Sequence, residues 1–151
     1  MSLDDWKKNG WLKEHVSSSQ EIGNLFDIVD RDLSDAKNVS LSADWRFGIA
    51  YNAALKLCTI LLMASGFRPD KNLAHYRTLL AMPLILGSDK KADAEYLDVC
   101  RVKRNSAEYD YTGAATTRDA DELIKFTAEL KVDVETWLQK YHPRLHKAKA
   151  K

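Results

Sequence analysis

Several features of specialised protein classes are missing from this chain. It has two cysteines in 151 residues, too few for a disulfide framework, and it contains no internal repeat and no low-complexity linker. Its net charge is +1, so it lacks the overall positive field that draws proteins to nucleic acids or membranes. Any contact with RNA therefore has to come from a local patch of charge.

Targeting, membrane and metal-binding signals are also scarce. The N-terminus has no apolar signal region, and the longest apolar run, residues 49–67, carries Asn52 and Lys56 near its first turns, which favours a buried helix over a membrane span. The four histidines lack metal-ligand spacing, so we expect neither a metal nor a cofactor. Cys58 and Cys100 fall in helical patterns, where we expect them reduced and buried, as in a cytoplasmic protein with no membrane partner.

Helical periodicity dominates what is present. Hydrophobic residues make up 45% of the chain and charged residues 30%, which is ordinary for a globular protein of one domain. Apolar residues recur at steps of three and four, and no run of useful length alternates as a strand does. We therefore expect one all-α domain over residues 1–151, an antiparallel bundle of roughly four to five main helices after a short N-terminal helix, with residues 143–151 as a basic frayed tail.

Serine residues mark where the first long helices begin. Ser18 or Ser19 precedes one apolar stripe and can cap the helix that carries it. Ser42 precedes a second segment that is apolar over much of its circumference. We expect this second segment to be the central helix of the bundle and to end at Gly66.

The later helices are separated by shorter signals. Residues 70–86 are predicted to form one helix, with Pro83 inside it as a source of a kink or an early end. Asp89 leads into a fifth helix, and Thr116 or Thr117 caps a last long one. The short connections between these helices favour antiparallel neighbours.

The most informative segment is the octapeptide at residues 104–111, Arg-Asn-Ser-Ala-Glu-Tyr-Asp-Tyr. It packs an arginine, an amide, two carboxylates and two phenols into about two turns, a density of polar groups that a buried core rarely tolerates. On a helix, Arg104, Glu108 and Tyr111 share one stripe, which Arg101 joins three residues earlier. We therefore expect the octapeptide to line a cleft or an interface.

Composition alone leaves two interpretations of the octapeptide open. Arg104 and Glu108 form an exposed ion pair worth about a few tenths of a kcal/mol, or Arg104 is a fork-shaped donor to a phosphate and Asn105 orients a ligand oxygen or base edge. Asn105 and Tyr109 form the neighbouring stripe, and on a straight helix Arg104 and Tyr109 point about 140° apart. They converge only if the helix bends or ends, which the break at residues 112–113 favours, or if a partner chain folds around it.

Two separate motifs follow one another in the chain. Residues 50–54 read Ala-Tyr-Asn-Ala-Ala, followed by a turn at Gly66 and by His75, and residues 104–111 fit the pattern Arg-Asn-x-x-x-Tyr-x-Tyr. This combination resembles the HEPN family, whose members show an Ala-Tyr-x-Ala-Ala helix, a Gly turn, a following helix near a histidine and an Arg-Asn-x-x-x-His-x-Tyr pattern. The resemblance covers about residues 44–111, and it implies a small all-helical bundle that pairs as a homodimer.

The resemblance also implies roles for the octapeptide. Family RNases cleave RNA without a metal; their arginine holds the scissile phosphate and their histidine moves protons. Arg104 matches that arginine, Asn105 its polar neighbour and Tyr111 the trailing tyrosine, while Tyr109 occupies the histidine position. A phenol titrates at about pH 10 and an imidazole at about pH 6.5, so Tyr109 is a poor general base at neutral pH. We therefore expect a non-catalytic module that binds a nucleotide, RNA or a protein partner through a polar cleft around Arg104 and Asn105.

Residues outside the octapeptide complete this hypothesis. Asp44 and Arg46, at the start of the central helix, are expected at the rim of the cleft. Arg68 and His75 also fit the spacing of an arginine, six residues and a histidine, but they flank a turn that contains proline. We expect His75 to have a packing or capping role.

Three alternative functions stay open. One is an active RNase toxin of a toxin–antitoxin pair, in which Tyr109, Glu108 or Asp110 takes over the role of the histidine. Another is a partnership with a minimal nucleotidyltransferase, which in some HEPN pairs adds adenylate to the motif tyrosine, here Tyr111. The third is a purely structural helical dimer that buries aromatic side chains such as Tyr51 and Trp45.

Overall fold

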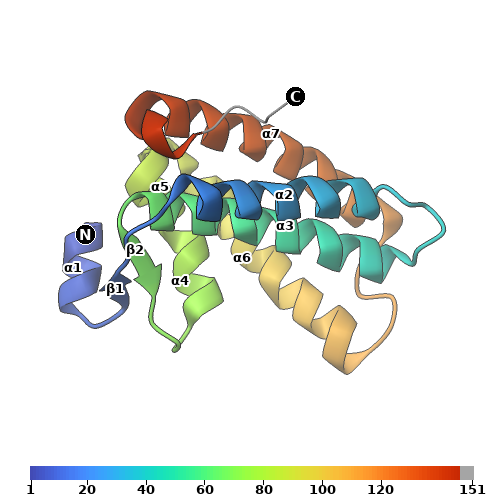
Figure 1. Ribbon diagram of the computed structural model, residues 1–151. Helices are drawn as coiled ribbons and strands as arrows, with labels where there is room; N and C mark the ends of the chain where they lie inside the picture. The colour runs from blue at the N-terminus through green and yellow to red at the C-terminus, as the bar shows by residue number, and fades with distance from the viewer. Residues whose placement is uncertain (147–151) are drawn as a thin grey trace.

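The computed structural model describes residues 1–146, which form a bundle of helices with one small sheet (Figure 1). The elements, in chain order, are α1 (Leu3–Lys8), β1 (Leu12–Glu14), α2 (Ser19–Ala36), α3 (Ala43–Ala64), β2 (Phe67–Pro69), α4 (Ala74–Leu80), α5 (Met82–Leu86), a 3-10 turn (Ser88–Lys90), α6 (Lys91–Asn105), a π turn (Ser106–Asp110), α7 (Thr117–Tyr141) and a second 3-10 turn (Pro143–Leu145). The expectation of an all-α helical bundle is confirmed.

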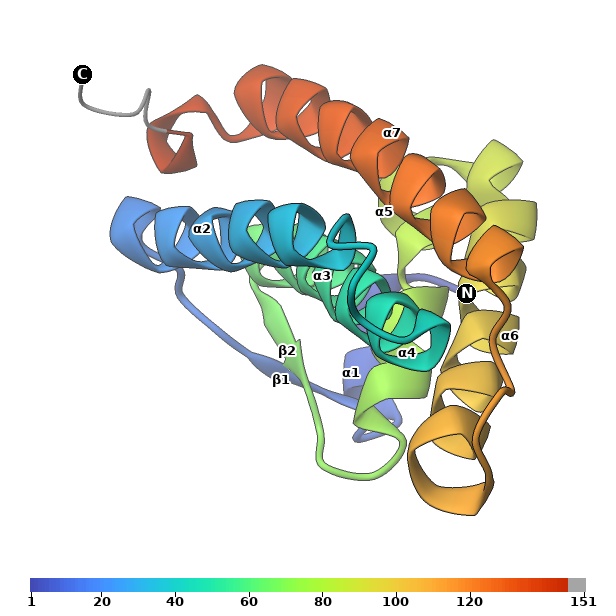
Figure 2. The same ribbon diagram turned by 90° about the vertical axis from the view of Figure 1, so that its right-hand side faces the viewer.

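Helix α3 lies at the centre of the bundle. Helix α2 packs along it, α7 lies across the pair, and α4 and α6 cover the remaining sides (Figures 1 and 2). The side chains of Phe47, Tyr51, Leu57 and Leu61 on α3 are at most 2% exposed. Because full burial of a Leu or Phe side chain contributes about 1.5–3 kcal/mol, α3 supplies a large part of the stability of the fold.

The long apolar run of α3 is covered by protein. By length and composition α3 is also a candidate for crossing a membrane, and 67% of its most apolar window is buried inside the fold. The prediction of a buried central helix from residue 49 onward is thus confirmed for the described residues.

The predicted helix caps hold the starts of the long helices. The hydroxyl groups of Ser18, Ser42 and Thr116 each accept a hydrogen bond from the backbone N–H three residues later, at 3.1, 3.1 and 3.0 Å. Asp119 completes a capping box by accepting from the backbone N–H of Thr116 at 2.9 Å. Each such cap is worth about 1 kcal/mol, so the boundaries of α2, α3 and α7 follow from local chemistry.

The helix expected over residues 70–86 starts later than predicted and is interrupted near Pro83, where the sequence indicated a kink or an early end. Helix α4 begins only at Ala74, after Leu73 adopts a left-handed conformation with φ of 55°, and it ends at Leu80. A second helix, α5, then starts at Met82 with Pro83 in its first turn. Proline lacks the N–H that a continuous helix needs and its ring crowds the preceding turn, so the helix is interrupted there.

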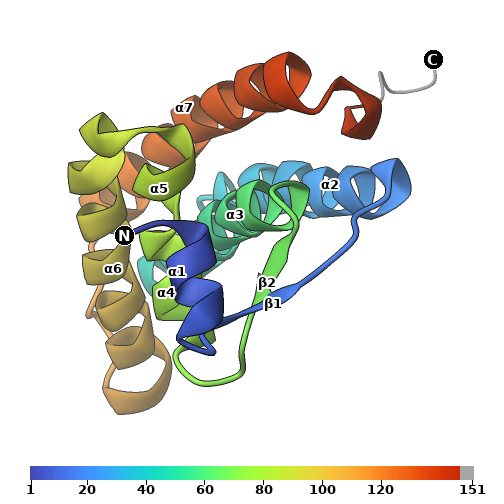
Figure 3. The same ribbon diagram turned by 90° about the vertical axis from the view of Figure 1, so that its left-hand side faces the viewer.

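A small antiparallel sheet explains the late start of α4. Strands β1 and β2 pair from Leu12 opposite Pro69 to Glu14 opposite Phe67, which keeps the chain extended after α3 (Figure 3). The sheet was not predicted, because strands of three residues are too short to show an alternating pattern. It brings Trp6 and Leu12 onto a second apolar cluster with α3 and the α4–α5 junction.

The C-terminal segment is more ordered than expected near residue 143. Pro143 begins a 3-10 turn, and the side chain of Leu145 is buried in the main core. An apolar side chain that reaches the core outweighs the fraying expected from the polar residues around it. The frayed tail predicted for residues 143–151 therefore does not describe residues 143–146, and residues 147–151 lie outside the described part of the chain.

Both cysteines are unpaired and buried, as predicted. Burial raises the pKa of the Cys58 thiol to about 12 and that of the Cys100 thiol to about 11. The two thiols are thus neutral and serve as small core residues.

Candidate functional site

The octapeptide lies where α6 changes its helical geometry. Regular α-helix ends at Asn105, and residues 106–110 form a π turn closed by a hydrogen bond of 3.1 Å from the Tyr111 N–H to the Ser106 carbonyl. Bonds from residue i to i+5 widen the helix, and such turns are frequent at functional sites. The expectation that the helix bends or ends within the octapeptide is therefore confirmed.

Arg104 is held from its own helix and lies against α3. Its Nε contacts the Glu108 carboxylate at 2.9 Å, and its Nη1 donates to the side-chain oxygen of Asn105 at 3.2 Å. Its guanidinium carbon lies 5.9 Å from the centre of the Tyr51 ring on α3. The ion pair predicted for Arg104 and Glu108 is present, and it stands directly over a buried phenol.

Tyr51 has a buried hydroxyl without a hydrogen-bond partner among residues 1–146. Its side chain is 1% exposed. Burial raises the pKa of Tyr51 well above its usual range, and the positive charges of Arg101 and Arg104 oppose this rise. The phenol is therefore a neutral donor whose hydroxyl lies within the field of both guanidinium groups.

Arg101 lies one turn before Arg104 on α6 and contacts α4. Its Nε donates to the Asp98 carboxylate at 2.8 Å, one turn earlier on α6. Its guanidinium carbon lies 5.6 Å from the centre of the Tyr76 ring on α4. A cation over an aromatic face is favourable, so this contact contributes to the packing of α4 beside α6.

His75 belongs to this surface, which corrects its predicted packing or capping role. It lies in the first turn of α4, where no side chain caps the helix, and it is exposed rather than packed. Partial burial lowers the pKa of His75, and the charges of Arg104, Lys56 and Arg101 lower it further. Cations from α3 and α6 thus add to the effect of burial on His75, which no local spacing in the sequence indicated.

We define Lys56, His75, Arg101 and Arg104 as the cationic cluster. Its members come from α3, α4 and α6, and the buried Tyr51 hydroxyl lies within the field of Arg101 and Arg104. Lys56 makes no ion pair with any residue in the described range 1–146, whereas the two arginines are paired with carboxylates. Guanidinium groups match the geometry of phosphate oxygens, so the cluster has the chemistry of an anion-binding site.

Asp44 and Arg46 form hydrogen bonds to backbone groups outside the cationic cluster. The two carboxylate oxygens of Asp44 accept from the backbone N–H groups of Gly113 and Ala115 at 2.7 and 2.9 Å, which ties the loop after the π turn to α3. Arg46 is buried, and it donates to the Ala36 carbonyl at 2.8 Å and to Asp121 at 2.7 Å. The contacts of both side chains are thus with the α2, α7 and loop segments around the start of α3.

The two tyrosines of the octapeptide are surface residues. Tyr109 is 75% exposed and Tyr111 is 62% exposed. The side-chain partners of Arg104 within its own segment are Glu108 and Asn105, which leaves Tyr109 outside that hydrogen-bonded group. Adenylylation of Tyr111 stays a prediction, and its exposed ring is accessible for it.

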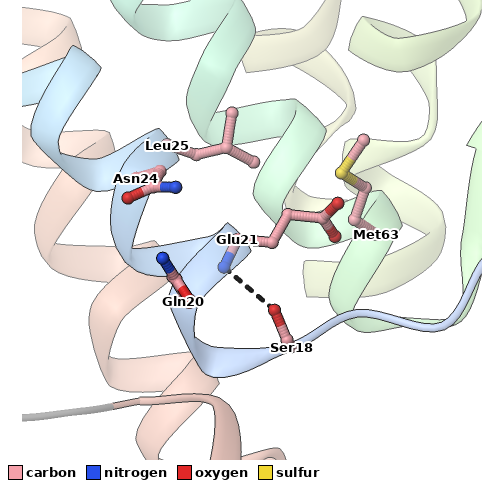
Figure 4. Close-up of a pocket in the computed structure, with 6 residues that line it drawn as sticks. All are labelled: Ser18, Gln20, Glu21, Asn24, Leu25 and Met63. Carbon is pink, nitrogen blue, oxygen red and sulfur yellow. Dashed lines mark hydrogen bonds between the residues drawn. The ribbon is translucent and has the colours of Figure 1, made fainter.

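A separate pocket of about 410 Å³ opens at the start of α2 (Figure 4). It is lined by Ser18, Gln20, Glu21, Asn24, Leu25 and Met63. Its polar groups already serve the fold, since the Ser18 hydroxyl caps α2 and the Glu21 carboxylate contacts His15 Nε2 at 2.7 Å. Within residues 1–146, no group of three or more His, Cys, Asp or Glu side chains gathers in a way that could hold a metal ion.

Comparison with known proteins gives no information about the function of this site. No protein-family model matches the chain, and neither does any curated protein or solved structure. The likeness to the HEPN family thus rests on the two motifs and on the helical fold. The function has to be argued from the cationic cluster itself.

Proposed function

We propose that this chain is a HEPN-like, non-catalytic module that binds a phosphate-bearing ligand, a nucleotide or an RNA, at the cationic cluster. The observation that carries the proposal is the buried Tyr51 hydroxyl, which lacks a hydrogen-bond partner among the described residues and lies in the field of Arg101 and Arg104. A buried donor left unpaired costs about 1–3 kcal/mol. A phosphate oxygen that accepts from this hydroxyl would recover that cost on binding.

The surroundings of Arg104 support the same proposal. The Glu108 carboxylate lies on its guanidinium at 2.9 Å, in the kind of position that a phosphate oxygen takes on an arginine. A ligand would exchange places with this carboxylate while Arg104 stays over Tyr51. Glu108 is therefore a competitor for the ligand, and its removal should strengthen binding.

The absence of a base at Tyr109 favours binding over cleavage. The Tyr109 ring is 75% exposed and lies outside the hydrogen-bonded group that Arg104 forms with Glu108 and Asn105. General-base catalysis works best when the pKa of the base lies near the working pH. We therefore assign the octapeptide to ligand recognition through Arg104 and Asn105.

Calorimetric titration with AMP at low ionic strength tests the proposal. Arg104→Ala and Arg101→Ala should each weaken binding by about tenfold or more, because each removes a charged fork donor worth about 1.5–3 kcal/mol. Glu108→Gln should strengthen it. Arg144→Ala removes the same charge from the exposed C-terminal 3-10 turn and should leave the affinity unchanged within about twofold.

Two results would refute the proposed function. Equal weakening by Arg104→Ala and Arg144→Ala would show that AMP is held only by overall charge. Lack of binding of AMP and of short RNA by the wild-type protein would leave a protein partner or the structural dimer as the better hypotheses.

A further inference from the structure

We propose that Trp45 stacks on the base of a nucleotide whose phosphate binds at Arg104 and Tyr51. The inference rests on the proposed function and deepens it, because it makes the ligand a nucleotide rather than a phosphorylated sugar. It is carried by the position of Trp45 on α3 relative to Arg104 and by the exposure of its side chain.

Trp45 begins a row of residues that leads along α3 to the proposed phosphate site. Trp45, Gly48 and Tyr51 follow one another at steps of three, so they form one slanted row on the surface of the helix. The side chain of Arg104 lies on this row. Its Cγ is 3.8 Å from the point that a β-carbon on Gly48 would occupy, and its guanidinium carbon is 5.9 Å from the centre of the Tyr51 ring. Trp45 is therefore the next residue of the row beyond the aliphatic part of Arg104.

The spacing along this row suits a nucleotide. Tyr51 follows Trp45 by six residues, which corresponds to about 9 Å along the helix axis. Gly48 lies between them, and neighbours at a step of three have β-carbon positions about 5–6 Å apart. A nucleotide with its phosphate at the Arg104 guanidinium can thus lay its ribose beside the aliphatic part of Arg104 and direct its base toward Trp45.

The side chain of Trp45 is exposed although its backbone is held in place. Trp45 is 56% exposed, whereas tryptophan is a strongly buried residue on average. Its backbone N–H donates to the hydroxyl of the capping residue Ser42 at 3.1 Å. The preceding residue, Asp44, accepts from the backbone N–H groups of Gly113 and Ala115 at 2.7 and 2.9 Å. An aromatic side chain on a fixed backbone loses little conformational entropy when it binds a flat ligand.

A nucleotide is the occupant that matches both ends of the row. The guanidinium of Arg104 and the Tyr51 hydroxyl are donors for a phosphate, and Trp45 offers an aromatic ring on which a base of any sequence can stack. Stacking of one base on an aromatic side chain changes the affinity by about five- to 150-fold. A phosphorylated sugar would use the donors alone, so the base should contribute most of the selectivity.

Calorimetric titration with AMP and with ribose 5-phosphate at low ionic strength tests the inference, since the two ligands share the phosphate and the ribose and differ by the base. Wild-type protein should bind AMP about tenfold or more tightly than ribose 5-phosphate. Trp45→Ala should lower the affinity for AMP to that for ribose 5-phosphate and leave the latter unchanged within about twofold. Trp45→Phe should keep part of the preference for AMP, because the smaller ring still stacks.

Tyr141→Ala is the matched control for the loss of an exposed aromatic ring. Tyr141 is 59% exposed and ends α7, whereas the side of α7 that contacts the start of α3 is at Asp121, which pairs with Arg46. The twenty residues between Asp121 and Tyr141 span about 30 Å of helix. This variant should bind both ligands as the wild-type protein does.

The outcomes separate this inference from the function on which it rests. The inference is overturned, while phosphate binding stands, if wild-type protein binds AMP and ribose 5-phosphate equally or if Trp45→Ala keeps the preference for AMP. Equal weakening of both ligands by Trp45→Ala would assign Trp45 a structural role and would also overturn the inference. Loss of the preference in Tyr109→Ala but not in Trp45→Ala would place the base on the π turn instead. Failure of wild-type protein to bind either compound or short RNA overturns both the inference and the proposed function.

Discussion

Replacement of Tyr51 by Phe should make the protein more stable and a weaker binder. The hydroxyl of Tyr51 is buried and has no hydrogen-bond partner in the described residues, while the ring is packed in the core. Removal of an unpaired buried hydroxyl avoids a desolvation cost of about 1–3 kcal/mol and leaves the packing of the ring in place. We expect the free energy of unfolding to rise by about 1 kcal/mol, which for a chain of this size raises Tm by about 2–4 °C.

The assay combines urea unfolding, followed by tryptophan fluorescence, with AMP titration. Thr127→Val is the matched control, since the Thr127 hydroxyl on α7 is also buried without a partner among residues 1–146. Both variants should be stabilised, but only Tyr51→Phe should lose affinity for AMP, by about tenfold for one hydrogen bond of about 1.4 kcal/mol.

One result would refute the reasoning about this hydroxyl. If Tyr51→Phe lowers the free energy of unfolding by about 1 kcal/mol or more, the hydroxyl has a stabilising partner in solution. The Tyr51 hydroxyl would then already have a hydrogen-bond partner without a ligand, and the proposed phosphate site would lose the observation that carries it.

Three further predictions concern stability and reactivity. Arg46→Met should lower the free energy of unfolding by about 1–3 kcal/mol in urea titrations, because the Ala36 carbonyl at the end of α2 loses its buried donor. Cys58 and Cys100 should resist a thiol reagent in the native state and both react after unfolding, since burial raises the pKa of each thiol; fast native labelling would contradict their burial. The pKa of His75 is lowered from 6.5 in the fold, so the unfolded chain binds its proton first and stability should fall as pH drops below about 6.5; in His75→Gln this part of the pH dependence should disappear, and an unchanged pH profile would show that other groups cause it.

Local chemistry explains which parts of the fold were predictable. Ser18, Ser42 and Thr116 cap their helices through bonds to residues three positions away, so the sequence spacing contains the information. The Arg104–Glu108 pair follows from the i,i+4 geometry of a helix in the same way. These features depend on neighbours along the chain and needed no knowledge of the packing.

The arrangement of the candidate site depends on packing between helices. His75 and Arg104 lie far apart in sequence, and they share a surface because α4 docks against α3 and α6. Asp44 was expected at a cleft rim, yet its carboxylate holds two backbone N–H groups of the loop after the π turn, a partner that no spacing rule predicts. Contacts of this kind are set by tertiary structure, which overrides what a pattern of one segment can indicate.

Local opening of the short helix α4 would uncover one side of the cationic cluster. This helix is seven residues long, it starts after a left-handed Leu73, and no side chain caps its first turn, so its first N–H groups lack the support that the longer helices have. A segment of this kind opens at a lower free energy than the core around α3. Each opening would carry His75 and Tyr76 away while Arg101 and Arg104 stay in place. The affinity for the ligand would therefore depend on the fraction of molecules in which α4 is docked. Ligand binding would stabilise the docked state, and hydrogen exchange of the α4 amides would slow.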